Sequence, residues 1–220
     1  MARSKGALSP YLLGVGTNQW GKPASEPNDV FSAALDAGVQ LIDTAEVYVK
    51  GASESAVGAA ARADPRPCFI ATKYIPMPWH FDVKKHLMEH LDASLRRLGR
   101  ESVDLLYIHA PTSPRPVEAQ AQALVAALSS GKARNVAVSN FSVSEMRRMH
   151  TALAAHGYPL CANQVEFSLY RALPMENGML AACEELGVQL VAYCPLGSGR
   201  LLSSEPAKHP REAALRSAVD

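Results

Sequence analysis

The 220-residue sequence predicts an α/β fold, specifically a TIM (β/α)8-type barrel that lacks its eighth βα unit. Seven short apolar runs rich in β-branched residues start 25 to 35 residues apart, and stretches of helical period lie between most of them. Runs that are apolar throughout suit strands buried on both faces of a parallel sheet, and alternation at this spacing indicates βα units. In chain order the runs are YLLGVG from Tyr11, VQLIDTAE from Val39, CFIATKY from Cys68, VDLLYIHA from Val103, NVAVSN from Asn135, LCANQVEFS from Leu160 and VQLVAYCPL from Val188.

The segments between the runs have the spacing of amphipathic helices. From Val83, leucines recur in steps of four and three as far as Leu98, and Gly99 supplies a stop, which predicts a helix over 83–98. SVSEMRRMHTALAAHG from Ser142 and ENGMLAACEELG from Glu176 likewise predict helices that end in glycine.

Two architectures fit this alternation, a doubly wound open sheet and a closed barrel. A nucleotide-binding open sheet favours GxGxxG after the first strand, but GVGTNQ has only Gly14 and Gly16, and no helix follows at once. Polar residues end at least five of the predicted strands, as barrel enzymes require for a site built at one mouth. These residues are Asp43, Lys73, His109, Ser139 with Asn140, and Gln164 with Glu166. We therefore favour the barrel.

Composition excludes several classes of function. The net charge is +1 with both signs interspersed, which argues against a nucleic-acid or anionic-membrane partner. Apolar runs fall far short of the ~18 residues that a membrane span needs, and the N-terminus lacks the apolar stretch of a secretory signal. The four cysteines are scattered, as in a reducing compartment. We expect a cytoplasmic protein, or a plastid one if the N-terminus is incomplete.

The polar strand ends suggest a reaction. Asp43 and Lys73 would end adjacent strands and balance each other's charge at a semi-buried mouth. Tyr48, just past Asp43, would lie within reach of the lysine cation, which favours the phenolate and makes the hydroxyl a usable acid. His109 could hydrogen-bond an oxygen held near Tyr48. This set suits carbonyl reduction, for which a nicotinamide cofactor must supply the hydride.

At this point the sequence resembles the aldo-keto reductases, from about Leu12 to Leu202. IDTAEVY, ATK, YIH, VSNF, NQVEFSL and AYCPLGSGRL occur in that family's order, and KYIPMPW is similar to its plant-plastid and bacterial branches. The resemblance implies a barrel that uses NADPH to reduce an aldehyde or ketone, with a small-molecule carbonyl substrate as its partner. It implies a catalytic tetrad of Asp43, Tyr48, Lys73 and His109.

The resemblance also implies roles around the cofactor and substrate. Asp43 would contact the cofactor, Ser139, Asn140 and Gln164 would hold the nicotinamide carboxamide, and Tyr193 would stack on its ring. Leu196 and Ser198 would lie in the loop over the pyrophosphate, Gly16 and Thr17 would line the cofactor's other side, and Trp20 would wall the substrate pocket beside Tyr48 and His109. Taken singly, each residue also fits a plain structural role, such as an interstrand ion pair, a core histidine or a packing aromatic.

HLMEH, from His86 to His90, fits the H-x-x-E-H pattern of zinc peptidases. The two histidines would share one face of the predicted helix, but its apolar stripe begins at Val83 and leaves them on the flank or in solvent. No downstream acidic ligand stands out. We expect a solvated helix surface and no metal.

The domain is expected to span 1–202 with strands one to seven, followed by a polar tail, 203–220, with a short helix at REAALRSAV. The family's eighth strand, its basic segment for the adenosine 2′-phosphate and its C-terminal substrate loop are not found, so we expect a truncated product that binds NADPH weakly. Two other functions stay open: a non-catalytic nicotinamide-binding regulatory subunit of the same fold, and an inactive fragment. The sequence indicates neither the substrate nor the oligomeric state.

Overall fold

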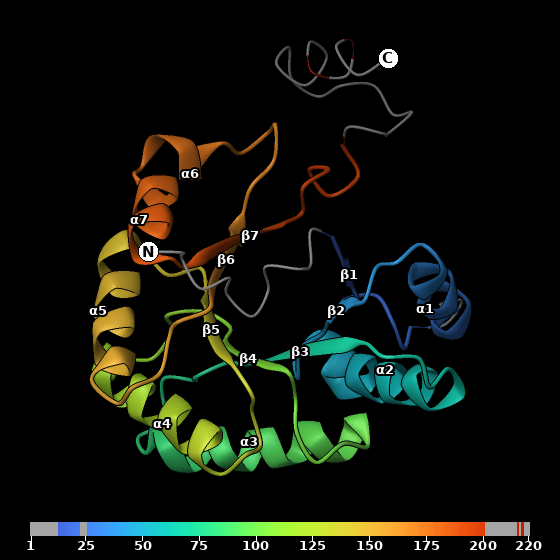
Figure 1. Cartoon of the computed structure of the whole chain (residues 1–220), viewed down its shortest axis with the longest axis horizontal. Coiled ribbons are helices and arrows are strands. Elements are labelled where there is room, and N and C mark those ends of the chain that lie inside the picture. The colour runs from blue at the N-terminus through green and yellow to red at the C-terminus, as the bar shows by residue number, and fades with distance from the viewer. Residues whose placement is uncertain (1–12, 23–25, 201–214, 216, 218–220) are drawn as a thin grey trace.

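A computed structural model describes residues 13–22, 26–200, 215 and 217. Seven strands form one parallel sheet in the order β1-β2-β3-β4-β5-β6-β7, so each strand lies beside its neighbours in sequence, and the sheet curls as Figure 1 shows. The strands are β1 (Gly14–Gly16), β2 (Leu41–Asp43), β3 (Phe69–Tyr74), β4 (Leu105–Ile108), β5 (Val136–Ser139), β6 (Ala162–Glu166) and β7 (Gln189–Tyr193). The predicted seven parallel strands are confirmed, and the described residues contain no eighth.

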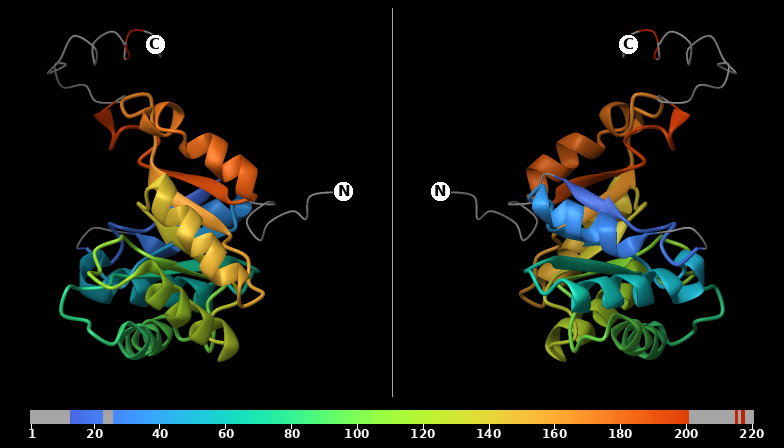
Figure 2. Two further views of the ribbon diagram at one scale, coloured as in Figure 1. Left: turned by 90° about the vertical axis from the view of Figure 1, so that its left-hand side faces the viewer. Right: turned by 90° about the vertical axis from the view of Figure 1, so that its right-hand side faces the viewer.

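Helices cover the outer face of the curled sheet, as the two side views show (Figure 2). They are α1 (Pro27–Asp36), α2 (Ala52–Ala63), α3 (Val83–Leu98), α4 (Val117–Ser129), α5 (Val143–Ala154), α6 (Leu173–Glu176) and α7 (Met179–Leu186). A short 3₁₀ segment, Tyr48–Gly51, precedes α2. Within the described residues, β1 pairs only with β2 and β7 only with β6.

Local signals set the helix ends. In α3 the Asp82 side chain accepts a bond from the backbone of Lys85, and Gly99 ends the helix with φ 67°, so the predicted bounds 83–98 are confirmed. Ser142 and Glu145 form a capping box that starts α5.

One predicted helix begins later than expected. The helix expected from Glu176 begins at Met179 as α7 and ends before Gly187 as expected, whereas Glu176 is the last residue of α6. Gly178 between them has φ 79°, a left-handed conformation that breaks the helical path and that glycine adopts without cost.

Of the predicted tail, 203–220, only Leu215 and Ser217 are described, and both are helical; the rest of that prediction lies outside the described residues.

Because side chains alternate across a strand, each strand divides its residues between two cores. One face packs on the helices and includes Ile42, Ile70 and Leu106. The alternate residues form a second cluster within the curl of the sheet: Leu41, Ala71, Leu105, Tyr107, Ala137 and Ala162, together with Cys161, which precedes β6. The next inward positions along these strands are polar, which places the site at their carboxyl ends.

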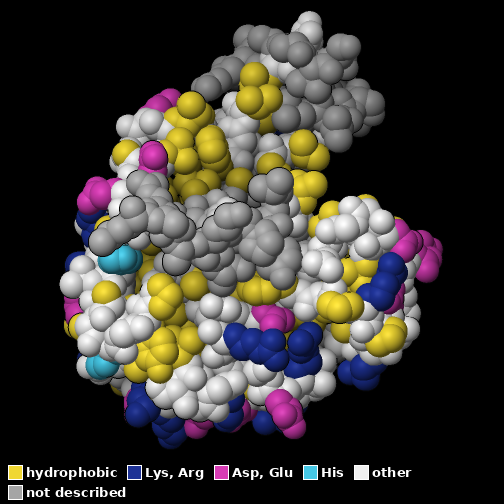
Figure 3. Space-filling model, viewed as in Figure 1, with side chains coloured by type: hydrophobic (Ala, Val, Ile, Leu, Met, Phe, Trp, Pro, Cys, Tyr) yellow, Lys and Arg dark blue, Asp and Glu magenta, His cyan; other side chains and the backbone are white. Residues whose placement is uncertain are grey.

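The surface does not carry a single-sign field on the face shown in Figure 3, where Lys and Arg side chains lie among Asp and Glu. Among the described helices, none has the length and apolar character needed to cross a membrane.

Candidate active site

The sheet register brings the polar strand ends to one rim. Asp43 at the end of β2 pairs with Ala71 of β3, Lys73 two residues later pairs with Tyr107 of β4, and the pleat therefore points both charged side chains to the same side. Ser139 at the end of β5 pairs with Gln164 of β6, on the same alternation.

Lys73 is the centre of the charged group. Its side chain is fully buried, and it forms an ion pair with Asp43, whose side chain is 17% exposed. The ammonium also donates to the Thr44 carbonyl at 2.9 Å and to the Tyr48 hydroxyl at 3.2 Å. A buried ammonium is tolerated when it is both paired and hydrogen-bonded. The same donor stabilises the Tyr48 oxygen once that oxygen has released its proton.

His109 lies against Tyr48, with ring centroids 5.7 Å apart and ring planes at 81°. Burial, followed by the charge of Lys73, lowers the pKa of His109 to about 4. Its Nδ1 is buried without a partner among the described residues. The imidazole is therefore neutral near pH 7 and keeps one N–H to donate and one nitrogen to accept.

Amide and hydroxyl side chains form the opposite wall. The Gln164 amide donates to Asp43 at 2.9 Å, and the Asn140 amide donates to the Ser139 hydroxyl at 3.0 Å. The Tyr193 hydroxyl donates to the Asn140 carbonyl oxygen at 3.0 Å. These bonds hold the polar groups of β5, β6 and β7 in a fixed arrangement next to the charged group.

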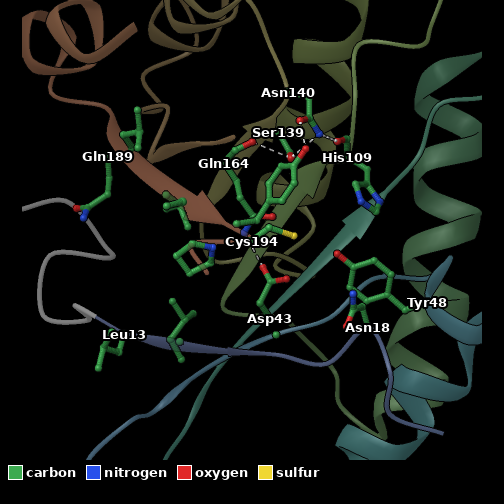
Figure 4. Close-up of a pocket in the computed structure, with 18 residues that line it drawn as sticks. Leu13, Asn18, Asp43, Tyr48, His109, Ser139, Asn140, Gln164, Gln189 and Cys194 are labelled. Carbon is green, nitrogen blue, oxygen red and sulfur yellow. Dashed lines mark hydrogen bonds between the residues drawn. The ribbon is translucent and has the colours of Figure 1, made fainter. Parts of the chain in front are cut away.

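All these side chains except Lys73 line one cavity of about 620 Å³, shown in Figure 4. The cavity extends from Tyr48 and His109 to β7 and the start of β1, where it reaches Leu13 and Gly14. Its volume is within the range of small-molecule and cofactor sites.

Besides Lys73, four residues assigned from the sequence lie outside this cavity lining. Thr17 is fully buried and its hydroxyl bonds to the Asp43 carbonyl and to Ser53. Trp20 is 7% exposed and belongs to the main core, so it does not wall this cavity. Leu196 and Ser198 are exposed in the segment after β7. Gly16, by contrast, lines the cavity.

The backbone after Tyr48 is unusual. Val49 and Lys50 have φ 48° and 55°, in the left-handed region. For residues other than glycine such conformations cost on the order of 1–3 kcal/mol each, and they cluster at functional sites. Nothing in the local pattern VYVKG except the glycine indicates this bend.

Glu46 has partners that the sequence does not indicate. Its carboxylate bonds to His90, 2.6 Å away, and accepts the Ile75 N–H at 2.9 Å. The acidic residue inside IDTAEVY was the available signal, but its partner lies 44 positions along the chain.

His86 and His90 lie on the flank of α3, as expected, but they are less solvated than a free helix surface would be. The His86 ring stacks on His80 with centroids 4.2 Å apart, and His90 pairs with Glu46, so the two side chains are only 31% and 37% exposed. Among the described residues, no group of three His, Cys, Asp or Glu side chains is arranged to hold a metal ion.

Comparison with known proteins shows which protein family the chain resembles. The model of the aldo/keto reductase family matches residues 12–217. The chain is 30% identical to a chloroplastic pyridoxal reductase of Arabidopsis thaliana, covering 96% of this chain and 65% of the relative. It is 33% identical to a 6-dehydroglucose reductase of Novosphingobium aromaticivorans, covering 97% and 72%. It thus spans about two thirds of the length of these curated relatives.

Solved structures agree. An aldo/keto reductase from Klebsiella pneumoniae, in complex with NADP and acetate, superposes with a TM-score of 0.72 at 30% identity, covering 85% of this chain and 65% of that one. A thermostable aldo-keto reductase bound to the inhibitor epalrestat gives a TM-score of 0.74 at 28% identity, covering 89% and 70%. The chain therefore belongs to the aldo/keto reductase family.

Proposed function

We propose that this protein reduces an aldehyde or ketone to an alcohol with NADPH. One observation carries the proposal: the Tyr48 hydroxyl, bonded to the buried Lys73 ammonium, stands beside a neutral His109 at a cavity wall. The family membership and the reductase relatives support the same reaction.

The proton chemistry follows from these contacts. As negative charge grows on the carbonyl oxygen, the Tyr48 hydroxyl donates its proton to that oxygen. Lys73 stabilises the phenolate that remains, and Asp43 balances the lysine charge in both states. His109, being neutral, donates an N–H bond that orients and polarises the substrate oxygen.

The opposite wall fits a nicotinamide. NADPH, when bound, supplies the hydride that protein side chains cannot provide. Ser139, Asn140 and Gln164 present the donors and acceptors that a carboxamide needs, and the Tyr193 ring lies on the cavity wall for stacking. A Cβ built at Gly16 would meet nothing within 4 Å, so glycine there leaves cavity volume free for the cofactor. We also propose that Leu196 and Ser198, which are exposed in the segment after β7, would lie over the pyrophosphate of NADPH.

The test is aldehyde-dependent NADPH oxidation by the 220-residue chain, with Tyr48→Phe and the control Tyr158→Phe. Both variants remove one phenol hydroxyl, but Tyr158 lies outside the cavity, with its hydroxyl 3.4 Å from Ser129. Tyr48→Phe should lower turnover by about 10²–10⁴-fold, the usual contribution of a positioned general acid, and the control should match the parent. Turnover retained by Tyr48→Phe would contradict proton delivery by this phenol. NADPH binding by the parent without turnover of aromatic or aliphatic aldehydes would favour the regulatory-subunit alternative instead.

A further inference from the structure

The position of Tyr48 depends on a segment under backbone strain. Val49 and Lys50, which follow it, adopt left-handed φ angles that β-branched and long side chains rarely take. Strain of this kind persists only where surrounding contacts determine the conformation. The contacts of the residues before Tyr48 therefore bear on where its oxygen lies relative to Lys73.

Glu46, two residues before Tyr48, makes such contacts in two directions. Its N–H donates to the Lys73 carbonyl at 3.4 Å, and its Oε1 accepts the Ile75 N–H at 2.9 Å, so the loop is fastened to the end of β3. Its Oε2 lies 2.6 Å from the Nδ1 of His90 on α3. The Glu46 side chain is 9% exposed. One carboxylate thus ties the Tyr48 loop to the strand that carries Lys73 and to a helix outside the sheet.

His90 is itself held by neighbouring rings. Its centroid is 5.3 Å from that of Tyr74, in an edge-on arrangement, and 5.2 Å from that of His80. The hydrogen bond with Glu46 raises the pKa of His90, which therefore keeps its proton to higher pH than a free histidine. The ionisable groups around it are Glu46 from the β2 loop, Tyr74 from β3, His80 from the β3–α3 loop, and His86, Glu89 and Arg97 from α3.

His80 packs against His90 and is itself held by hydrogen bonds. Its Nδ1 accepts the Met77 N–H at 3.2 Å and lies 2.7 Å from the Tyr74 hydroxyl, so that nitrogen carries no proton. Burial, then the charge of His86, lowers the pKa of His80. His80 is neutral and is held by two hydrogen bonds at its Nδ1, so its ring gives His90 a fixed surface to pack on.

We propose that Glu46, clamped by His90 and the Ile75 amide, is a positioning residue that keeps the Tyr48 hydroxyl within hydrogen-bond reach of Lys73. The inference deepens the proposed function, because Tyr48 matters through its proton. It also gives the HLMEH pattern a role unrelated to metal: His90 supports the catalytic loop from outside the sheet, and His86 stacks on the ring that His90 packs against.

A plain packing role for the Glu46–His90 pair predicts something different. Losing such a pair would lower stability and leave the Tyr48 environment unchanged in the folded protein. A clamp acts on the phenol itself, so its loss should be visible at Tyr48 in protein that is still folded.

The primary test is carbon NMR of the chain labelled at the ring carbon that bears the tyrosine hydroxyl, with the Tyr48 signal identified by its absence in Tyr48→Phe. Glu46→Gln, which keeps the shape and removes the charge, and His90→Gln should each shift or broaden the Tyr48 signal. Glu185→Gln is the matched control, because it makes the same change in a surface carboxylate paired with Arg147. The signal of Tyr158, whose hydroxyl lies near Ser129 and outside the cavity, serves as an internal reference.

Kinetics add a second readout. If the parent turns over aldehyde, Glu46→Gln should lower kcat by about tenfold to a hundredfold, as small misplacements of catalytic groups do, with KM within threefold of the parent. If the parent shows no turnover, the proposed function fails while the NMR result still decides the clamp. A parent Tyr48 signal that stays fixed while His90 titrates, or one unchanged in folded His90→Gln, would overturn the clamp.

Discussion

Because His109 is neutral in the folded protein, the free energy of unfolding should fall on acidification. Replacing His109 should remove this part of the pH dependence. His109 titrates at about 4 in the folded protein, against 6.5 for an unperturbed histidine. Between these values the unfolded chain binds a proton at this residue and the folded one does not. Stability from this difference is therefore complete above pH 6.5 and is lost as the pH falls toward 4.

The size of the effect follows from the shift. A pKa difference of about 2.5 units corresponds to about 3 kcal/mol, or about 1.4 kcal/mol per pH unit within the window. Because the ring borders the cavity, we expect about 2–3 kcal/mol in practice. The exchange His109→Gln substitutes a side chain that does not titrate, so this contribution should vanish.

The assay is equilibrium urea unfolding of the parent and of His109→Gln at several pH values from 4 to 7.5, with His156→Gln, an exposed site, as the control. The difference in unfolding free energy between parent and His109→Gln should be constant above pH 6.5 and fall steadily below it. The control should run parallel to the parent. A parent and His109→Gln that run parallel across the window would refute a neutral, buried His109, and with it the hydrogen-bond role given to this ring.

Three further substitutions test the packing that supports the site, all by urea unfolding at neutral pH. Gly58→Ala should lose about 1–3 kcal/mol, although alanine usually favours helices, because a Cβ at Gly58 in α2 would lie 2.5 Å from the Leu98 carbonyl oxygen of α3. Ser142→Ala should cost about 1 kcal/mol, because it removes the capping box of α5. Arg97→Met should cost about 3–5 kcal/mol, because it leaves the Glu54 carboxylate, which is fully buried, without its cation.

For each of the three substitutions, one result would contradict the structural reason given. A stabilising Gly58→Ala would show that α2 and α3 do not approach as closely as described. A neutral Ser142→Ala would mean that the cap does not form in solution. A loss below about 1 kcal/mol for Arg97→Met would place Glu54 in contact with water.

The periodic elements were accessible from the sequence because their signals are local. The leucine spacing before Gly99 fixed α3 at both ends, and the apolar runs identified the parallel strands in order. The strand β2 is shorter than its run, because the polar segment after Asp43 leaves the sheet to form the loop that carries Tyr48.

The contacts that finish the site were not accessible in the same way. Asp43, Lys73 and His109 could be placed at strand ends, and Tyr48 in the loop just past Asp43, because a parallel sheet collects its carboxyl ends on one side. The Glu46–His90 pair and the left-handed Val49 depend on contacts between a loop and a helix far apart in sequence, which no local pattern specifies. Trp20 is a different case. It lies in the segment after β1, where the sequence suggested a residue of the substrate pocket, but its side chain packs in the main core.

The central claim is that this cavity brings a carbonyl oxygen to Tyr48 while hydride reaches the carbonyl carbon. The most direct measurement uses NADPH with deuterium at the transferable position of its nicotinamide, an aldehyde, and mass spectrometry of the alcohol formed by the 220-residue chain. We predict one deuterium on the carbinol carbon of each alcohol molecule with the parent, and almost no alcohol with Tyr48→Phe. Alcohol that contains no deuterium, or equal amounts of labelled alcohol from both proteins, would contradict the account.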